Sequence, residues 1–155
     1  MGLFSSLFKK PNYAAMSKDE LFALKDKKFY EAVITAKNKE YQNRLGELTD
    51  LQKAIFAVNE FDCIAFADVQ EFFKSSAALA PCLADGLDRI GALKTKALVE
   101  KLTCDAELNG APVTLNPFAV KEFEEAYDPF DDNAEKLDAL LIAYVKKNFD
   151  EYYKF

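Results

Sequence analysis

The clearest periodic pattern in the chain is an apolar stripe that begins at residue 61. Its apolar residues recur at the intervals that place side chains on one face of an α-helix. Asp62, Asp68 and Glu71 fall mostly on the other faces. The pattern predicts an amphipathic helix whose buried side consists of Phe61, Ile64, Ala65, Val69, Phe72 and Phe73.

A second apolar stripe follows Ser75 and Ser76. Pro81 is compatible with a helix only near its start, and Gly91 is a typical residue to end one. A second helix is therefore predicted between them, and we expect the fold to be organised around residues 61–92. The buried side of this helix consists of Leu79, Leu83, Leu87 and Ile90.

Two capping boxes predict helix starts before this segment. Ser17 with Glu20, and Thr49 with Gln52, can each close two free backbone N–H groups at a helix start. Residues 18–45 contain no Gly or Pro, so one long helix and two abutting helices fit equally well. The second box opens a helix that leads directly into the stripe at residue 61.

Four further segments complete the pattern. Residues 93–103 predict a helix with Leu93, Ala97, Leu98 and Leu102 on one face. The stretch CDAELNGAPVTLNP is predicted to be a loop rather than a sheet.

Asn116 and Pro117 then open a helix that stops at Asp128 and Pro129. The last helix is predicted to begin at Asp132 or Asn133 and to run to the end of the chain.

These patterns together predict an all-α fold, a single compact domain of about seven helices over residues 17–155 with no substantial β-sheet. Residues 1–16 form an amphipathic lead or flexible arm in this interpretation. Gly2 and Ser6 fit the myristoylation pattern. Because that pattern is short and frequent by chance, we expect a packed or frayed arm rather than a membrane anchor.

Composition removes several classes of enzyme. Half of the 155 residues are hydrophobic and 30% are charged, which is typical of globular domains. The absence of histidine excludes an imidazole base and a His-ligated metal. Glycine-rich phosphate loops, the nucleophile elbow and C-x-x-C are also absent. We therefore expect no enzymatic activity, no cofactor and no metal.

The three cysteines are widely spaced, which favours reduced thiols and a cytoplasmic location. Cys63 and Cys82 fall within apolar helical patterns and are predicted to pack in the core. No apolar run approaches the roughly 20 residues that a membrane-spanning helix needs.

The net charge of −6 is unevenly distributed. Residues 1–48 carry nine Lys and Arg against six Asp and Glu, whereas residues 49–155 carry eleven against twenty. The acidic part would repel a nucleic-acid backbone and attract a basic protein surface. We therefore expect a protein partner with a basic surface and no direct binding of nucleic acid.

An acidic run between residues 122 and 138 is the candidate partner-binding surface. Densely spaced carboxylates on one exposed surface could imitate the phosphates of duplex DNA. The alternative is that they serve solvation and capping, with Asp131 or Asp132 and Glu135 at the start of the last helix. The run comprises Glu122, Glu124, Glu125, Asp128, Asp131, Asp132, Glu135 and Asp138.

Residues 61–92 also resemble a family of bacterial domains of unknown function whose best-known member is a DNA-mimic protein. The similarity extends over roughly residues 45–155, through an Asp-rich turn before a Leu-rich, Tyr-containing last helix. The family's Asn-Gly-Gly is replaced here by Ala65, Phe66 and Ala67. The matching residues are Gln70, Phe72, Phe73, Ser75, Ser76, Ile90, Gly91 and Ala92.

The resemblance implies an all-helical domain, often a dimer. For the DNA-mimic member it implies an acidic surface that occupies the DNA-binding face of a transcriptional regulator. The loss of two glycines at Phe66 and Ala67 removes easy access to positive φ, so we expect an unbroken helix there.

The function expected from these observations is that of a non-enzymatic intracellular interaction protein, an acidic DNA mimic that occupies the basic surface of a DNA-binding protein. One alternative is an immunity or antitoxin-like protein that recognises a specific toxin by shape, with little dependence on salt. Another is an uncharacterised hydrolase or ligand-binding domain, which would be favoured by a deep pocket with convergent polar groups.

Overall fold

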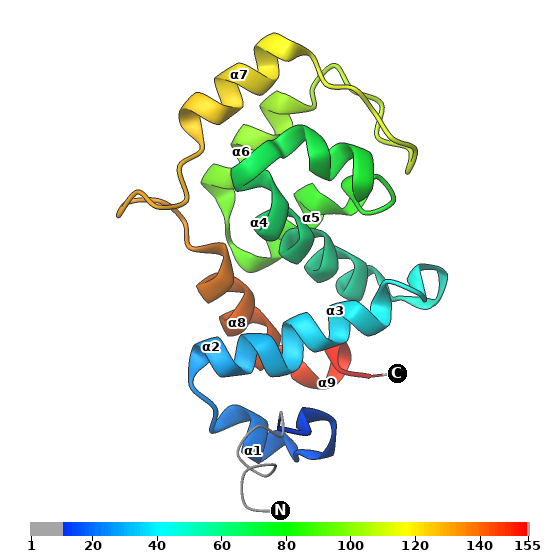
Figure 1. Ribbon diagram of the computed structural model, residues 1–155, viewed down its shortest axis with the longest axis vertical. Helices are drawn as coiled ribbons and strands as arrows, with labels where there is room; N and C mark the ends of the chain where they lie inside the picture. Colours follow the sequence, from blue (N-terminus) through cyan, green and yellow to red (C-terminus); the bar gives the residue numbers. More distant parts are fainter. Residues whose placement is uncertain (1–10, 155) are drawn as a thin grey trace, which may run out of the picture.

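The computed structural model describes residues 11–154, which form helices and connecting segments without a β-strand (Figure 1). The predicted all-α fold is confirmed. The predicted lead at residues 1–16 lies mostly outside the described residues. The α-helices are α1 (Lys18–Phe22), α2 (Asp26–Phe29), α3 (Ala36–Tyr41), α4 (Asp50–Ser75), α5 (Leu83–Ile90), α6 (Leu93–Leu102), α7 (Pro117–Ala126), α8 (Leu137–Lys147) and α9 (Phe149–Tyr152).

Four short segments of other helical types precede or connect them: η1 (Tyr13–Ala15), before α1, and then η2 (Tyr30–Thr35), η3 (Leu45–Glu47) and η4 (Ala80–Cys82). Of these, η2 is a π-helical segment between α2 and α3, so that residues 26–41 form one continuous helix. Residues 23–25 separate this helix from α1, which resolves the ambiguity of the sequence in favour of two helices.

Helix α4 is the centre of the fold and contacts α5, α7, α8 and α9 (Figure 1). Its predicted stripe is buried except for Ile64, which is half-buried. The predicted face of α5 is buried as well, from Leu83 to Ile90. The capping boxes at Ser17 and Thr49 are present, and Gly91 ends α5 with a φ of 80°.

The expectation of an unbroken helix near residues 65–67 is wrong, because α4 is kinked at Asp68. The backbone of Asp68 is extended, with φ −161° and ψ 101°. Its carboxylate accepts a hydrogen bond of 3.2 Å from the N–H of Glu71 and so caps the second part of the helix. A helix can therefore break here without glycine, since any residue adopts this extended backbone.

Helices α4 and α5 cross in close contact at Gly86. A Cβ atom added to Gly86 would lie 2.6 Å from Cγ2 of Val58 and closer still to the carbonyl oxygen of Ala54. Only glycine fits between the two helices at this distance.

A buried polar network joins the continuous helix of residues 26–41 and α9 to α4. Asn59 donates a hydrogen bond to the Tyr30 hydroxyl and accepts one from the amide of Asn38. The Tyr152 hydroxyl lies 3.3 Å from Oδ1 of Asn38 and 3.5 Å from the carbonyl oxygen of Ile34 in η2. The network thus reaches from the interior to Tyr30, which lines a surface groove.

The loop predicted before α7 is held by the side chain of Gln70. Its amide donates to the carbonyl of Val113 and accepts from the N–H of Leu115, both at 3.0 Å. The N–H of Val113 also donates to the carbonyl of Phe73. The side chain of Gln70 therefore satisfies hydrogen-bonding groups of the loop backbone, which pairs with no strand in the described residues.

The predicted last helix is divided into α8 and α9 at Asn148, and it begins later than predicted. Helix α8 begins at Leu137, not at Asp132 or Asn133. The carboxylate of Asp131 accepts a hydrogen bond of 2.7 Å from the N–H of Asn133, and the ammonium of Lys136 donates to the carbonyl of Asp131. Such local side-chain bonds compete with the helix and favour a turn.

Two predicted packing roles are also wrong. Cys63 is exposed, so it does not pack in the core. Leu93 is 60% exposed and Ala97 is exposed too, while Thr95 and Val99 are buried, so the inward face of α6 is offset from the predicted one.

Candidate functional site

The acidic run extends over α7, the connecting segment 127–136 and the start of α8. In Figure 1 this segment projects to one side between α7 and α8. Its shape comes from its own side chains: Asp128 accepts from the N–H of Phe130 at 2.9 Å, and Lys136 donates to the carbonyl of Pro129 at 2.8 Å. The segment is thus a series of side-chain-supported turns.

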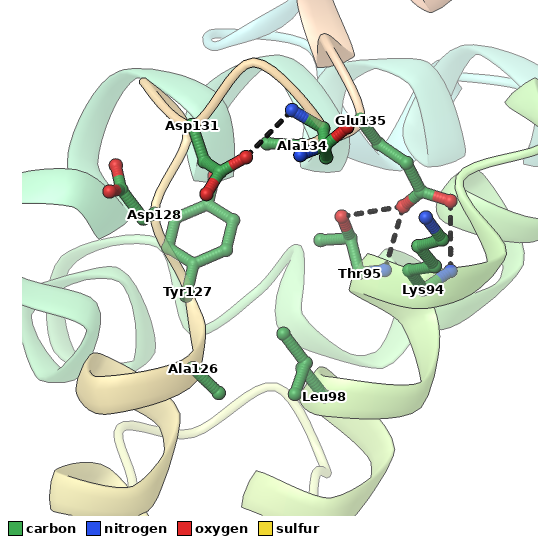
Figure 2. A pocket seen from close by; sticks show the side chains of 10 residues that line it. Lys94, Thr95, Leu98, Ala126, Tyr127, Asp128, Asp131, Ala134 and Glu135 are labelled. Atoms are coloured by element: carbon green, nitrogen blue, oxygen red, sulfur yellow. Dashed lines mark hydrogen bonds between the residues drawn. The ribbon is translucent and has the colours of Figure 1, made fainter.

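Glu135 crosses from this segment to the start of α6 (Figure 2). Its carboxylate accepts hydrogen bonds from the N–H groups of Lys94 and Thr95, at 2.9 and 2.7 Å, and from the Thr95 hydroxyl at 2.8 Å. Burial alone would raise the pKa of Glu135, but the bonds from Lys94 and Thr95 outweigh it and the pKa is lowered. Glu135 therefore caps α6 and not its own helix.

A hollow of about 260 Å³ lies beside this cap. Figure 2 shows Tyr127 and Asp131 on one side of it and Leu98 and Thr95 on the other. Asp131 is one of its charged residues, but its carboxylate is engaged by the N–H of Asn133. The polar groups of this hollow mainly serve the local fold.

The predicted carboxylates divide into engaged and unengaged groups. Glu122 pairs with Lys101 of α6 at 3.1 Å, and Glu125 lies 3.9 Å from Lys121. Within residues 11–154, the side chains of Glu124 and Asp132 make no ion pair and no hydrogen bond. The interpretation that Asp131 or Asp132 and Glu135 cap the start of the last helix is wrong, because Glu135 caps α6 and Asp131 supports a turn before α8.

Two exposed phenylalanines lie beside the run. Phe66 of α4 is 58% exposed and Phe130 is 72% exposed. Their rings meet edge to face with centroids 4.6 Å apart. We refer to Phe66 and Phe130 as the aromatic pair.

Phe66 of the aromatic pair lines two depressions. One, of about 380 Å³, is lined by Phe66 and Tyr127 together with Glu124, Glu125 and Asp128. The other, which we call the groove, has a volume of about 880 Å³ and lies between residues 26–35, residues 62–66 and residues 129–142. Phe66 and Phe130 both line the groove.

Asp138 is the one residue of the acidic run that lines the groove, and there it is near Asp62 of α4. Burial, and then the charge of Asp138, raise the pKa of Asp62 from 3.8 to about 6, against a smaller opposing hydrogen bond with Tyr30. Burial, followed by the charge of Asp62, also raises the pKa of Tyr30 and of Tyr127. Asp62 is thus a partly buried carboxylate whose ionised form is disfavoured by burial and by Asp138, and its charge in turn disfavours ionisation of Tyr30 and Tyr127.

The residues that sequence reasoning missed are Tyr30, Asp62, Phe66 and Phe130. One signal was available, because Phe66 is a large apolar residue outside the predicted stripe of its helix. The approach of Tyr30 and Asp138 to Asp62 has no sequence signal, since these residues are far apart along the chain.

The site offers carboxylates, phenols and exposed rings. Among the described residues, no group of three or more Cys, Asp and Glu side chains is placed to hold a metal ion. No helix in residues 11–154 has the length and apolar character needed to cross a membrane. The chemistry that the arrangement supports is the recognition of cationic and apolar groups.

Comparison with protein-family models, with curated proteins and with solved structures found no match for this chain. The resemblance to the DNA-mimic family and the dimer that it implies therefore stay predictions.

Proposed function

We propose that this chain is a non-enzymatic interaction protein that acts in the cytoplasm and binds a basic protein surface. The observation that carries the proposal is the exposed aromatic pair, whose Phe66 lines two depressions with carboxylates on their walls. Interfaces typically combine buried aromatic anchors with a polar rim, and here the rim is acidic. A partner of opposite charge would be steered to it and then held by the rings.

The narrower form of the proposal is DNA mimicry. In that form the partner is a DNA-binding protein, and unengaged carboxylates such as Glu124 and Asp132 take the places of phosphates. The net charge of residues 49–155 and the resemblance support it. The exposed rings favour a protein partner in either form, since a purely charged surface would not need them.

The test begins with capture of partners by the tagged full-length chain, followed by purification of the partner that is retained. Its affinity is then measured at low and high salt for the native chain and for the double variant Glu124→Gln, Asp132→Asn. We expect a basic partner, an affinity that falls with salt, and binding about tenfold weaker for the variant. The double variant Asp105→Asn, Glu107→Gln makes an equivalent charge change in the loop before α7; it is the matched control and should leave the affinity unchanged.

Competition with duplex DNA distinguishes the two forms. A partner that releases the chain when DNA is added supports mimicry, and a basic partner that does not bind DNA supports only the broader form. If the affinity changes neither with salt nor in the double variant, the proposal is overturned. That outcome would favour recognition by shape, as in an immunity protein.

A further inference from the structure

The groove contains carboxylates that lack a cationic partner, unlike other carboxylates on its walls. Asp26 pairs with Lys146 at 3.2 Å, and Glu31 pairs with Lys28 at 2.8 Å. Asp62 and Asp138 form no ion pair with any described residue. The two therefore line the same groove, near enough for the charge of Asp138 to raise the pKa of Asp62, without a cation to neutralise them.

The lysines that line the groove do not fill this role. Lys136 is turned into its own segment, where it donates to the carbonyls of Pro129 and Asp131. Lys27 is near Glu31, whose pKa is lowered by a hydrogen bond with Lys28 and by the charges of both lysines. A cation from outside the described chain would thus find Asp62 and Asp138 without an ion pair, with Asp62 hydrogen-bonded to Tyr30 and Asp138 accepting the N–H of Ala139 at 2.8 Å.

The aromatic pair supplies a second kind of contact for such a cation. A guanidinium group can stack on an exposed ring face and still donate hydrogen bonds to carboxylates in its plane. An ammonium is a compact point charge that cannot do both as well. The chain itself uses contacts between cations and rings, with Lys37 4.4 Å from the ring centre of Tyr153 and Lys146 4.8 Å from that of Phe29.

We propose that the groove receives an arginine side chain of the partner protein, whose guanidinium pairs with Asp62 and Asp138 while its flat face stacks on Phe66 or Phe130. This inference rests on the proposed function, since it names the anchor by which the basic partner is held. The groove's volume of about 880 Å³ leaves room for the residues on either side of that arginine.

The direct test uses blocked amino acids as probes with the isotope-labelled full-length chain in NMR titrations. Nα-acetyl-arginine amide should give saturable shifts at the backbone amides of Asp62, Phe66, Phe130 and Asp138. Nα-acetyl-lysine amide should bind at least about fivefold more weakly, because it lacks the planar guanidinium group. Equal affinities for the two probes, or shifts spread evenly over all acidic residues, would overturn the proposal.

Variants identify the contacts. Asp62→Asn should weaken arginine binding about tenfold, and Phe130→Ser should weaken it severalfold. The matched controls are Asp105→Asn and Phe118→Ser, which change an exposed carboxylate and an exposed phenylalanine elsewhere and should have no effect. Phe130 is exposed, so Phe130→Ser should leave the fold intact. It therefore tests the groove even if Asp62→Asn were to disturb the fold.

The pH dependence of the titration is a further readout. The groups that face Asp62 are Tyr30, Glu31, Lys27 and Asp26 on residues 26–35, Asp138 and Lys136 on the other wall, and Cys63 on its own helix. Arginine binding needs the ionised carboxylate, so the affinity should rise about tenfold from pH 5 to pH 7.5. The rise should be absent in Asp62→Asn, and its persistence in that variant would contradict the assignment to Asp62.

The outcomes for the groove and for the proposed function are separable. If the probe does not bind but the partner's affinity still depends on salt and on Glu124 and Asp132, only the groove proposal fails. If the arginine probe binds the groove but no basic partner is found, the proposed function fails and the groove remains a guanidinium site.

Discussion

Replacement of Asp62 by asparagine should stabilise the protein at neutral pH. Asp62 carries a partly buried carboxylate whose pKa is raised to about 6 by burial and then by Asp138, against a smaller hydrogen bond with Tyr30. Asparagine keeps the size and polarity of the side chain but removes the charge. A variant that becomes more stable while it loses a ligand would separate the role of Asp62 in binding from any role in folding.

The magnitude follows from the pKa of the folded protein. The difference between the ordinary value of 3.8 and about 6 corresponds to about 3 kcal/mol at most. Because Asp62 retains some contact with water, we expect a gain of about 1–2 kcal/mol in the free energy of unfolding.

The direction of the pKa shift also determines the pH range in which Asp62→Asn should be more stable than the native chain. A carboxyl group whose pKa is raised by folding destabilises the folded state only where it is ionised, so the cost is absent below about pH 4, grows up to about pH 6 and stays constant above that. Urea denaturation followed by circular dichroism should therefore show the advantage of Asp62→Asn at pH 7.5 and little of it at pH 4. Asp132→Asn, an exposed carboxylate without an ion pair, is the control and should change little at either pH.

The reasoning would be refuted if Asp62→Asn were less stable than the native chain at pH 7.5. The carboxylate would then hold the fold through a bond that asparagine cannot replace. An advantage of equal size at pH 4 and pH 7.5 would likewise show that ionisation of Asp62 is not its cause.

Two further variants test the fold around the site. Gly86→Ala should lower the free energy of unfolding by about 1–3 kcal/mol in urea titrations, because its Cβ would press on the carbonyl of Ala54 and force α4 and α5 apart. In the control Gly46→Ala the added Cβ meets nothing within 4 Å, so this variant should be nearly neutral. Equal effects of the two variants would refute the close crossing. Glu135→Gln should cost about 1 kcal/mol at pH 7 through a weaker cap on α6. Because the pKa of Glu135 is lowered in the folded state, this difference should shrink as the pH falls through that pKa, and a constant difference would contradict it.

Local signals were sufficient for most helix starts and buried faces. The boxes at Ser17 and Thr49 and the stripe from Phe61 to Phe73 depend on neighbouring residues along the chain, and the structure has all three. Where a helix start depends on a distant residue, no local pattern indicates it. The start of α6 is capped by Glu135, 40 residues from Thr95 along the chain.

The same limit applies to the candidate site. A run of carboxylates is visible in a sequence, but their partners are not, so Glu122 bound to Lys101 and Glu124 without a partner were indistinguishable. The groove is formed by three segments that are distant in sequence, and the crowding of Asp62 by Asp138 exists only in the folded chain. Periodicity could indicate only that Phe66 stands outside the buried face.

Exposed rings and a partly buried carboxylate without a cation meet at the groove, and this combination is an argument for function there. In residues 11–154 no buried side-chain nitrogen or oxygen lacks a hydrogen-bond partner, and the other large exposed apolar residues, Leu93 and Phe118, do not line the groove. At the groove, two large rings are exposed and Asp62 has no cation, and Tyr30 opens the π-helical segment η2. π-Helical segments frequently occur at functional sites, and local conflicts that a sequence retains are expected where binding requires them. A cationic partner would cover the rings and neutralise Asp62, so one occupant would resolve both conflicts.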